Sequence, residues 1–229
     1  RPRISILTPT YNTDPEALRS CIRSVQAQLY SNWEFCICDD ASSSQATRDL
    51  IANSAQHDSR IKFICLPSNR GVCGATNTAL RLASGVYVGL LDHDDELSPD
   101  ALYECVKLLQ DHPEADVIYS DEDKLERDGT RSEPFFKPDW SPELLLSGMY
   151  TCHFGLYRRE LVETVGAFRP GFEGSQDYDL MLRFFTFPRF STIGGNRRTL
   201  QLTIRGRSHV PLGSGCTRCE NICSAGGLK

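Results

Sequence analysis

Long apolar runs are missing from this sequence. Apolar stretches such as Val86 to Leu91 and Leu144 to Leu146 fall far short of the ~20 residues that a helix needs to cross a bilayer. A charged start followed by an apolar stretch and a small-residue cleavage site is also missing. The sequence therefore predicts neither a spanning helix nor a signal peptide. We expect a cytoplasmic location, and peripheral contact with the inner face of a membrane stays open.

Cysteines are too sparse for a disulfide scaffold. The chain has ten cysteines in 229 residues, about 4%, whereas disulfide scaffolds typically exceed ~8–10%. Four of them lie inside apolar stretches, where free cysteine behaves as a small buried hydrophobe: Cys36, Cys38, Cys65 and Cys105. This usage is typical of a reducing cytoplasm.

An excess of basic charge is also missing. The formal net charge is −5, and 191–229 carries six Lys or Arg against the single acid Glu220. The body before it, with 19 basic and 29 acidic residues, is therefore distinctly acidic. An acidic surface repels phosphate backbones, so we predict no nucleic-acid partner.

Apolar, β-rich segments alternate with helical patterns up to residue 120. Such alternation is typical of parallel strands joined by helical crossovers. The fold class predicted is therefore α/β, with a mostly parallel central sheet flanked by helices. The predicted strands are 4–7, 33–38, 62–65, 87–91 and 116–120, and the predicted helices are 15–27, 45–54, 73–83 and 99–111.

After residue 120 the pattern changes. Residues 126–142 show little periodicity and predict a long loop. A short helix near 143–146, an extended stretch near 152–157 and a helix at 176–185 follow. Residues 191–229 hold seven of the 17 glycines and no aromatic residue, a composition that favours an irregular, poorly ordered tail. Cys216, Cys219 and Cys223 in this tail lack a well-spaced fourth ligand, so we predict no zinc site there.

Polar groups follow four of the predicted strands. In an open α/β sheet, ligands bind beyond the carboxyl ends of the strands. We therefore expect four loops to converge on one site: Thr8 to Asn12, Asp39 to Ser42, Asn69 to Gly71 and Asp92 to Asp95.

The fourth loop is the most informative. Asp92, Asp94 and Asp95 place three carboxylates within four residues, and these would repel one another without a compensating cation. Hard oxygen ligands suit Mg²⁺ or Mn²⁺, so the loop predicts a divalent metal site. The alternative is that Asp95 caps the next helix and the other two carboxylates are solvated.

At this point the chain resembles the family-two glycosyltransferases, which have the A-type nucleotide-sugar fold. The resemblance covers residues 3 to about 185 and rests on the motifs after the four strands together with Gln176-Asp177-Tyr178-Asp179-Leu180. Tyr119 to Lys124, with Phe136 to Trp140, further resembles a bacterial branch that builds O-antigen and related surface polysaccharides.

The resemblance implies a nucleotide diphosphate sugar as donor. It implies that Thr8, Tyr11 and Asp39 hold the nucleotide base, that Asp92 contacts the ribose or its neighbourhood, and that Asp94 coordinates Mn²⁺ or Mg²⁺. Two alternatives stay open from the residues themselves. Tyr11 fits a core or helix-staple aromatic, and Asp39 fits a turn former whose side chain bonds its own backbone.

The resemblance also implies an inverting transfer of a hexosyl or deoxyhexosyl group, with Asp177 as the general base that deprotonates the acceptor. Gln176 replaces the Glu that is common before this base. Asp177 also fits a first-turn acid favoured by the helix dipole. We interpret Asp179 and Arg183 as an i,i+4 surface pair.

The acceptor implied is a glycan or a lipid-linked glycan. His153 and Trp140 fit either the acceptor side or a packed core. The parts implied are a glycosyltransferase domain at 1–190, with a nucleotide-binding part at 1–120 and an acceptor and catalytic part at 121–190.

The chain departs from the resemblance after about Thr186, where a strand and a His-Trp segment are expected and neither is found; His209 is no clear substitute. One alternative function is therefore a nucleotide-binding remnant without transfer activity. A nucleotidyltransferase is disfavoured, because Pro9-Thr10-Tyr11-Asn12 offers neither the glycine nor the lysine of a phosphate loop.

Overall fold

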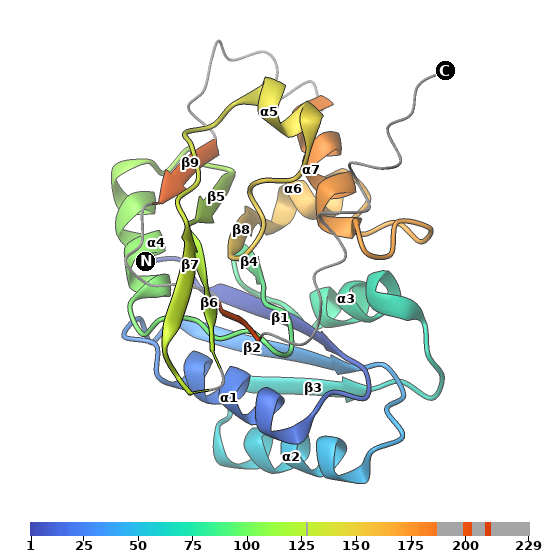
Figure 1. The fold of residues 1–229 in the computed structure, drawn as a ribbon. Helices are drawn as coiled ribbons and strands as arrows, with labels where there is room; N and C mark the ends of the chain where they lie inside the picture. The colour runs from blue at the N-terminus through green and yellow to red at the C-terminus, as the bar shows by residue number, and fades with distance from the viewer. Residues whose placement is uncertain (127, 187–198, 203–208, 212–229) are drawn as a thin grey trace.

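The computed structural model describes residues 1–126, 128–186, 199–202 and 209–211. Its centre is a seven-stranded sheet with strand order β3-β2-β1-β4-β8-β5-β9 (Figure 1). Strands β1 to β4 are mutually parallel, and β8 is antiparallel to both of its neighbours. The predicted α/β class with a mostly parallel sheet is confirmed. The strands are β1 (Ile4–Thr10), β2 (Trp33–Asp39), β3 (Ile61–Cys65), β4 (Tyr87–Leu90), β5 (Val117–Ser120), β8 (Gly155–Arg158) and β9 (Thr199–Leu202).

Helices pack on both faces of this sheet because side chains alternate along each strand. In β1, Ile4 and Ile6 join the core that contains residues of α1, α2 and α4, whereas Leu7 joins the core that contains residues of α3, α5, α6 and α7. The helices are α1 (Pro15–Gln26), α2 (Gln45–His57), α3 (Gly71–Leu82), α4 (Ala101–Asp111), α5 (Pro142–Ser147), α6 (Arg159–Thr164) and α7 (Gln176–Thr186). Among the described residues, no helix is long and apolar enough to cross a membrane.

The described cysteines serve mainly as core residues. All seven are free thiols, and Cys36, Cys38 and Cys105 are buried as predicted. Burial raises the pKa of each of these three thiols to about 12. Cys65 is exposed, so its predicted burial was wrong; it ends β3, which lies at the edge of the sheet. The cysteines at 216, 219 and 223 lie outside the described residues.

The prediction of a long loop at 126–142 was partly wrong. β7 (Arg131–Phe135) pairs antiparallel with β6 (Glu122–Leu125), and the turn between them is held by Asp128, whose carboxylate accepts from the amide and hydroxyl of Thr130. Most β7 side chains are exposed, so the hairpin shows no apolar periodicity in the sequence. β10 (His209–Pro211) extends this small sheet parallel to β6.

The chain does not divide into two structural parts at residue 120. β8, from the second half of the chain, lies between β4 and β5 of the first half. Two segments of the predicted irregular tail, β9 and β10, are strands, so the predicted absence of a strand after Thr186 was wrong; the rest of 191–229 lies outside the described residues. The parts 1–120 and 121–190 therefore share one sheet, and their separate functions stay a prediction.

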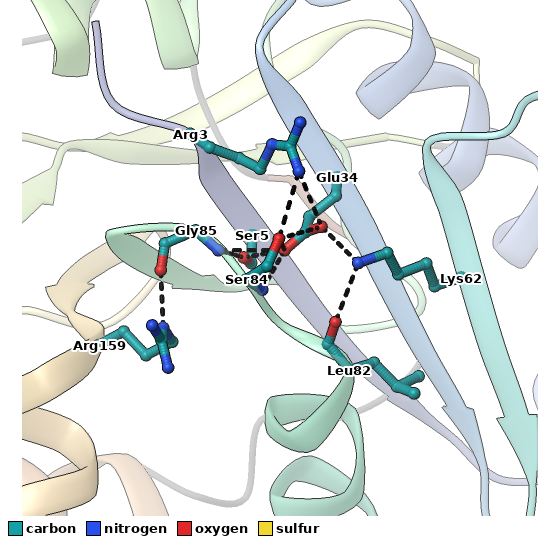
Figure 2. A network of polar contacts seen from close by, with 8 residues as sticks. All are labelled: Arg3, Ser5, Glu34, Lys62, Leu82, Ser84, Gly85 and Arg159. Carbon is teal, nitrogen blue, oxygen red and sulfur yellow. Dashed lines mark hydrogen bonds and ion pairs between the residues drawn. The ribbon is translucent and has the colours of Figure 1, made fainter.

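A buried carboxylate in β2, that of Glu34, joins β1, β3 and the segment before β4 near the amino ends of these parallel strands (Figure 2). Glu34 is 2% exposed and accepts from the Ser5 hydroxyl at 2.6 Å, from Lys62 Nζ at 2.7 Å and from the backbone of Ser84 and Gly85. Burial alone would raise the pKa of Glu34, but the hydrogen bonds from Lys62, Ser5 and Ser84 outweigh it and hold this pKa at about 2.

We expect Glu34→Gln to lower the free energy of unfolding by roughly 3 kcal/mol at neutral pH, because each pKa unit corresponds to about 1.4 kcal/mol. The folded-state pKa is depressed, so this stabilisation is present above the ordinary glutamate pKa and is lost as pH falls toward 2. Urea unfolding between pH 7 and pH 3 measures it. Glu104→Gln, which breaks the more exposed pair with Lys107, is the control and should change stability little. Equal acid sensitivity of wild type and Glu34→Gln would contradict the assignment.

Candidate functional site

The carboxyl ends of β1, β2 and β4 lie side by side. Thr10 is in register with Asp39, and Leu7 is in register with Leu90. Backbone hydrogen bonds continue past the strands, since the amide of Asp40 donates to Thr10 and that of Leu91 donates to Leu7. The predicted convergence of these loops is therefore observed.

The loops after β1 and β2 are held together by Asn12. Its side-chain oxygen accepts from the backbone amide and the hydroxyl of Ser43 at 2.9 and 3.0 Å, and its backbone amide donates to the Ser42 hydroxyl at 2.9 Å. Asn12 and Ala41 both have left-handed backbones, with φ of 50° and 62°. Such conformations persist only where the surroundings enforce them, and they cluster at functional sites.

The three residues predicted to hold the base differ in exposure. Tyr11 is 51% exposed, so the alternative of a core aromatic was wrong. Thr8 is fully buried, and its hydroxyl donates to the carbonyl of Leu91 at 2.7 Å. Asp39 is 1% exposed and accepts from the backbone amide of Ser42 at 3.1 Å, as the turn-former alternative requires. Tyr11 is thus the member of this trio whose side chain is exposed.

The loop after β3 also reaches this edge. The amide of Arg70 donates to the Asp40 carboxylate at 2.7 Å, and the Asn69 side chain donates to the Asp40 carbonyl at 3.4 Å. Asp40 itself is 2% exposed. All four polar loops singled out in the sequence therefore meet at the carboxyl ends of the strands.

The loop after β4 carries three carboxylates and contacts α1, where the Cys21 thiol lies 3.6 Å from the carbonyl of Asp92. The amide of Asp95 donates to the carbonyl of Asp92 at 3.1 Å, which closes a tight turn. Beneath the loop, burial and then the negative charges of Asp95, Asp94 and Asp92 raise the pKa of the Cys21 thiol well above its usual range. The loop therefore places the carboxylates of Asp92, Asp94 and Asp95 near the Cys21 thiol.

His153 joins this acidic loop from the segment before β8. Its Nδ1 lies 3.5 Å from Asp95 Oδ2, and Asp92, Asp95 and His153 each offer a ligand atom, all within 4.8 Å of one another. Asp94 is not in that group; its Oδ1 lies 3.6 Å from His93 Nδ1. The alternative role of Asp95 as a helix cap was wrong, because α4 begins at Ala101 after Asp100.

A second group of possible metal ligands lies close by, formed by Glu122, Cys152 and His153. The positively charged side chain of Lys137 already lies beside this group. Lys137 Nζ lies 3.3 Å from Glu122 Oε2 and donates to the carbonyl of His153 at 2.8 Å. Since an ammonium group already neutralises Glu122, the first group is the better candidate for a metal.

Asp177 occupies the first turn of α7, as predicted. Its carboxylate accepts from the amide of Tyr178 at 2.9 Å. Burial, followed by the negative charge of Asp177 and the effect of Cys152, raises the pKa of the Tyr157 phenol.

Asp179 is buried rather than on the surface, so that part of the prediction was wrong. Its carboxylate accepts from Arg183 Nε at 2.9 Å, as the i,i+4 pairing predicts, and from Arg169 Nε at 3.1 Å. Arg169 comes from the loop before α7, a partner that helical spacing does not reveal. Trp140 lies against Tyr150, with ring centroids 6.4 Å apart, and packs on the core.

Comparisons with known proteins identify the family of this chain. The family model described as "Glycosyl transferase family 2" matches residues 5–166, which include the four strand-end loops and His153 but not Asp177. The O-antigen biosynthesis protein RfbC of Myxococcus xanthus is 43% identical over 183 residues, which are 80% of this chain and 14% of that protein. The chain thus spans a small part of this relative.

Solved structures show the same fold. TarS of S. aureus in complex with UDP-GlcNAc has a TM-score of 0.72 at 18% identity, covering 93% of this chain and 59% of that one. A mannosyltransferase of Pyrobaculum calidifontis, in complex with GDP-Man and Mn²⁺, has a TM-score of 0.64 at 21% identity, covering 89% of this chain and 55% of that one. With the fold, the strand-end loops and the matched family model in agreement, the chain belongs to glycosyl transferase family 2.

Proposed function

We propose that this protein transfers a hexosyl or deoxyhexosyl group from a nucleotide diphosphate sugar to an acceptor hydroxyl, with inversion at the sugar carbon. The observation that carries the proposal is the group of Asp92, Asp95 and His153 beside Asp94, at the edge where a parallel sheet binds ligands. The TarS complex with UDP-GlcNAc supports the class of donor.

We propose Mn²⁺ or Mg²⁺ as the cofactor. Asp94 would hold the ion together with the group formed by Asp92, Asp95 and His153; the carboxylates would supply the oxygen ligands that both ions take, and His153 would add one imidazole ligand. The mannosyltransferase complex with Mn²⁺ supports this choice. When bound, the ion supplies positive charge for the departing diphosphate.

The remaining roles fall to side chains around the same edge. Tyr11, which is half exposed, contacts the base, while the buried Thr8 and Asp39 set the shape of the base-binding loops; Asp92 lies toward the ribose. Asp177 accepts the proton from the acceptor hydroxyl as its oxygen bonds to the sugar carbon. The bond from that carbon to the diphosphate oxygen breaks, and the diphosphate leaves with the electron pair.

The acceptor proposed is a glycan or a lipid-linked glycan of a cell-surface polysaccharide. The similarity to an O-antigen biosynthesis protein supports this class. A cytoplasmic protein that works at the inner face of the membrane would meet such an acceptor. The competing function, a nucleotide-binding remnant without transfer, predicts donor binding with no sugar transferred.

We expect a nucleotide diphosphate sugar to raise the melting temperature only when Mn²⁺ or Mg²⁺ is present. A ligand at ~100 times its Kd stabilises the native state by about 2.7 kcal/mol, which corresponds to a rise of roughly 5–10 °C for a chain of this size. A panel of donors, each with and without Mn²⁺, measures this by thermal unfolding. Inorganic phosphate with Mn²⁺ is the control. If no donor changes the melting temperature, the proposed donor site is wrong.

A further inference from the structure

Lys137 is a charged side chain placed wholly inside the protein. Its side chain is 0% exposed, whereas lysine is almost never fully buried unless it is paired. Nζ lies 3.3 Å from Glu122 Oε2 and donates to the carbonyls of Cys152 and His153. Its backbone amide donates to Asp121 Oδ1 at 2.8 Å, so both ends of this residue are anchored.

The segment 152–154, two of whose carbonyls accept from Lys137, is also held by contacts with β5 and β4. The amide of Phe154 donates to the Ser120 hydroxyl at 3.1 Å, and the amide of Ser120 donates to the Phe154 carbonyl at 3.1 Å. The Phe154 ring lies over Gly89 of β4, where an added Cβ would overlap it. His153, between these anchors, has a left-handed backbone with φ of 53°. For a residue other than glycine such a conformation is costly and must be enforced by its surroundings.

The contact of Lys137 with the His153 backbone also affects the acidic loop after β4. Lys137 binds the backbone of His153, and the imidazole of His153 extends to Asp95, with Nδ1 3.5 Å from Oδ2. Lys137 also places its charge next to Glu122, which would otherwise compete for a cation through the group it forms with Cys152 and His153. Both effects favour His153 as a cation ligand together with Asp92 and Asp95 rather than with Glu122.

We propose that Lys137 is a positioning residue that holds the carbonyls of Cys152 and His153, and thereby aims the His153 imidazole at the Asp92 and Asp95 carboxylates. This inference rests on the proposed function, since it concerns the cation site of that function. In this role Lys137 acts through His153. Partners that orient metal ligands in this way typically contribute 10–100-fold to metal affinity.

The test is Lys137→Met, which keeps the length of the side chain and removes its charge and donors. We expect the Kd for Mn²⁺, measured on the protein alone by electron paramagnetic resonance, to rise by about 10–100-fold. The NMR signals of the His153 imidazole should shift as well, a change that lost stability alone would not cause. Lys107→Met, at a lysine on α4 that is 61% exposed, is the control and should bind Mn²⁺ as wild type does.

A second variant separates the carbonyl contacts from the charge balance. Lys137→Met combined with Glu122→Gln leaves no unpaired buried charge from this pair, so we expect it to fold even where the single variant does not, yet still to bind Mn²⁺ weakly. Wild-type affinity for Mn²⁺ in this double variant would overturn the proposed role of Lys137 but not the proposed cation site. Failure of the wild-type protein to bind Mn²⁺ would overturn the proposed cation site and the role of Lys137 with it.

Discussion

Asp177→Asn is expected to lower the rate of sugar transfer by roughly 10²–10⁴-fold, the usual contribution of a general base, while donor binding stays unchanged. Asparagine keeps the size of the side chain and can still accept the hydrogen bond from the amide of Tyr178, so the start of α7 should be preserved. It cannot take a proton from the acceptor hydroxyl. Initial rates of transfer and donor affinity, both measured on the same preparation, test whether the rate falls while binding is unchanged.

Glu160→Gln is the matched control for this experiment. Glu160 is also an acid in the first turn of a helix, α6, so it shares the interaction of Asp177 with the helix dipole, which is worth about 0.3–1 kcal/mol. A dipole role alone would make the two variants alike, each with slightly lower stability and full transfer. Full transfer by Asp177→Asn would therefore remove Asp177 as the base.

Asp94→Asn is expected to weaken Mn²⁺-dependent donor binding by roughly 100-fold or more, because a carboxylate at the cation would be lost and each factor of ten corresponds to about 1.4 kcal/mol. The side chain of Asp94 is 26% exposed, so the substitution should leave the fold intact. Calorimetric titration of a nucleotide diphosphate sugar, with Mn²⁺ and with EDTA, measures the effect.

Asp95→Asn and His153→Ala are the comparisons for that measurement. Both alter the group that the structure brings together, whereas Asp94 is assigned by resemblance to the family. If the two comparison variants lose Mn²⁺-dependent binding while Asp94→Asn keeps it, the cation belongs to the group of Asp92, Asp95 and His153 alone. Unchanged binding in all three variants would move the cation away from this loop.

Much of the fold could be predicted because its signals are local. Asp14 accepts from the amides of Glu16 and Ala17, and Pro15 begins α1, as the pattern of cap and proline predicts. Leu18 and Val25 are buried on the face expected from their spacing. The loops after β1 to β4 were predictable for a related reason, since each polar motif directly follows an apolar strand.

The contacts around His153 could not be predicted in the same way. They depend on β8 entering the sheet between β4 and β5, antiparallel to both, and no local pattern specifies which strands a later segment will join. Lys137 stood within a motif that the resemblance singled out, but its burial and its contacts with two carbonyls involve residues about fifteen positions away. The pairing of Asp179 with Arg169 was hidden because Arg169 lies in the loop before α7, outside the helical spacing.

The sequence by itself determined the α/β class, the helices and strands up to residue 120, and the four polar loops, because capping, periodicity and strand-end position act over a few neighbouring residues. The tertiary structure alone decided which carboxylates lie beside His153 and which one pairs with Lys137. Asp92 and Asp95 meet His153, and Glu122 meets Lys137, because long-range strand pairing joins parts of the chain whose spacing carries no record of that contact.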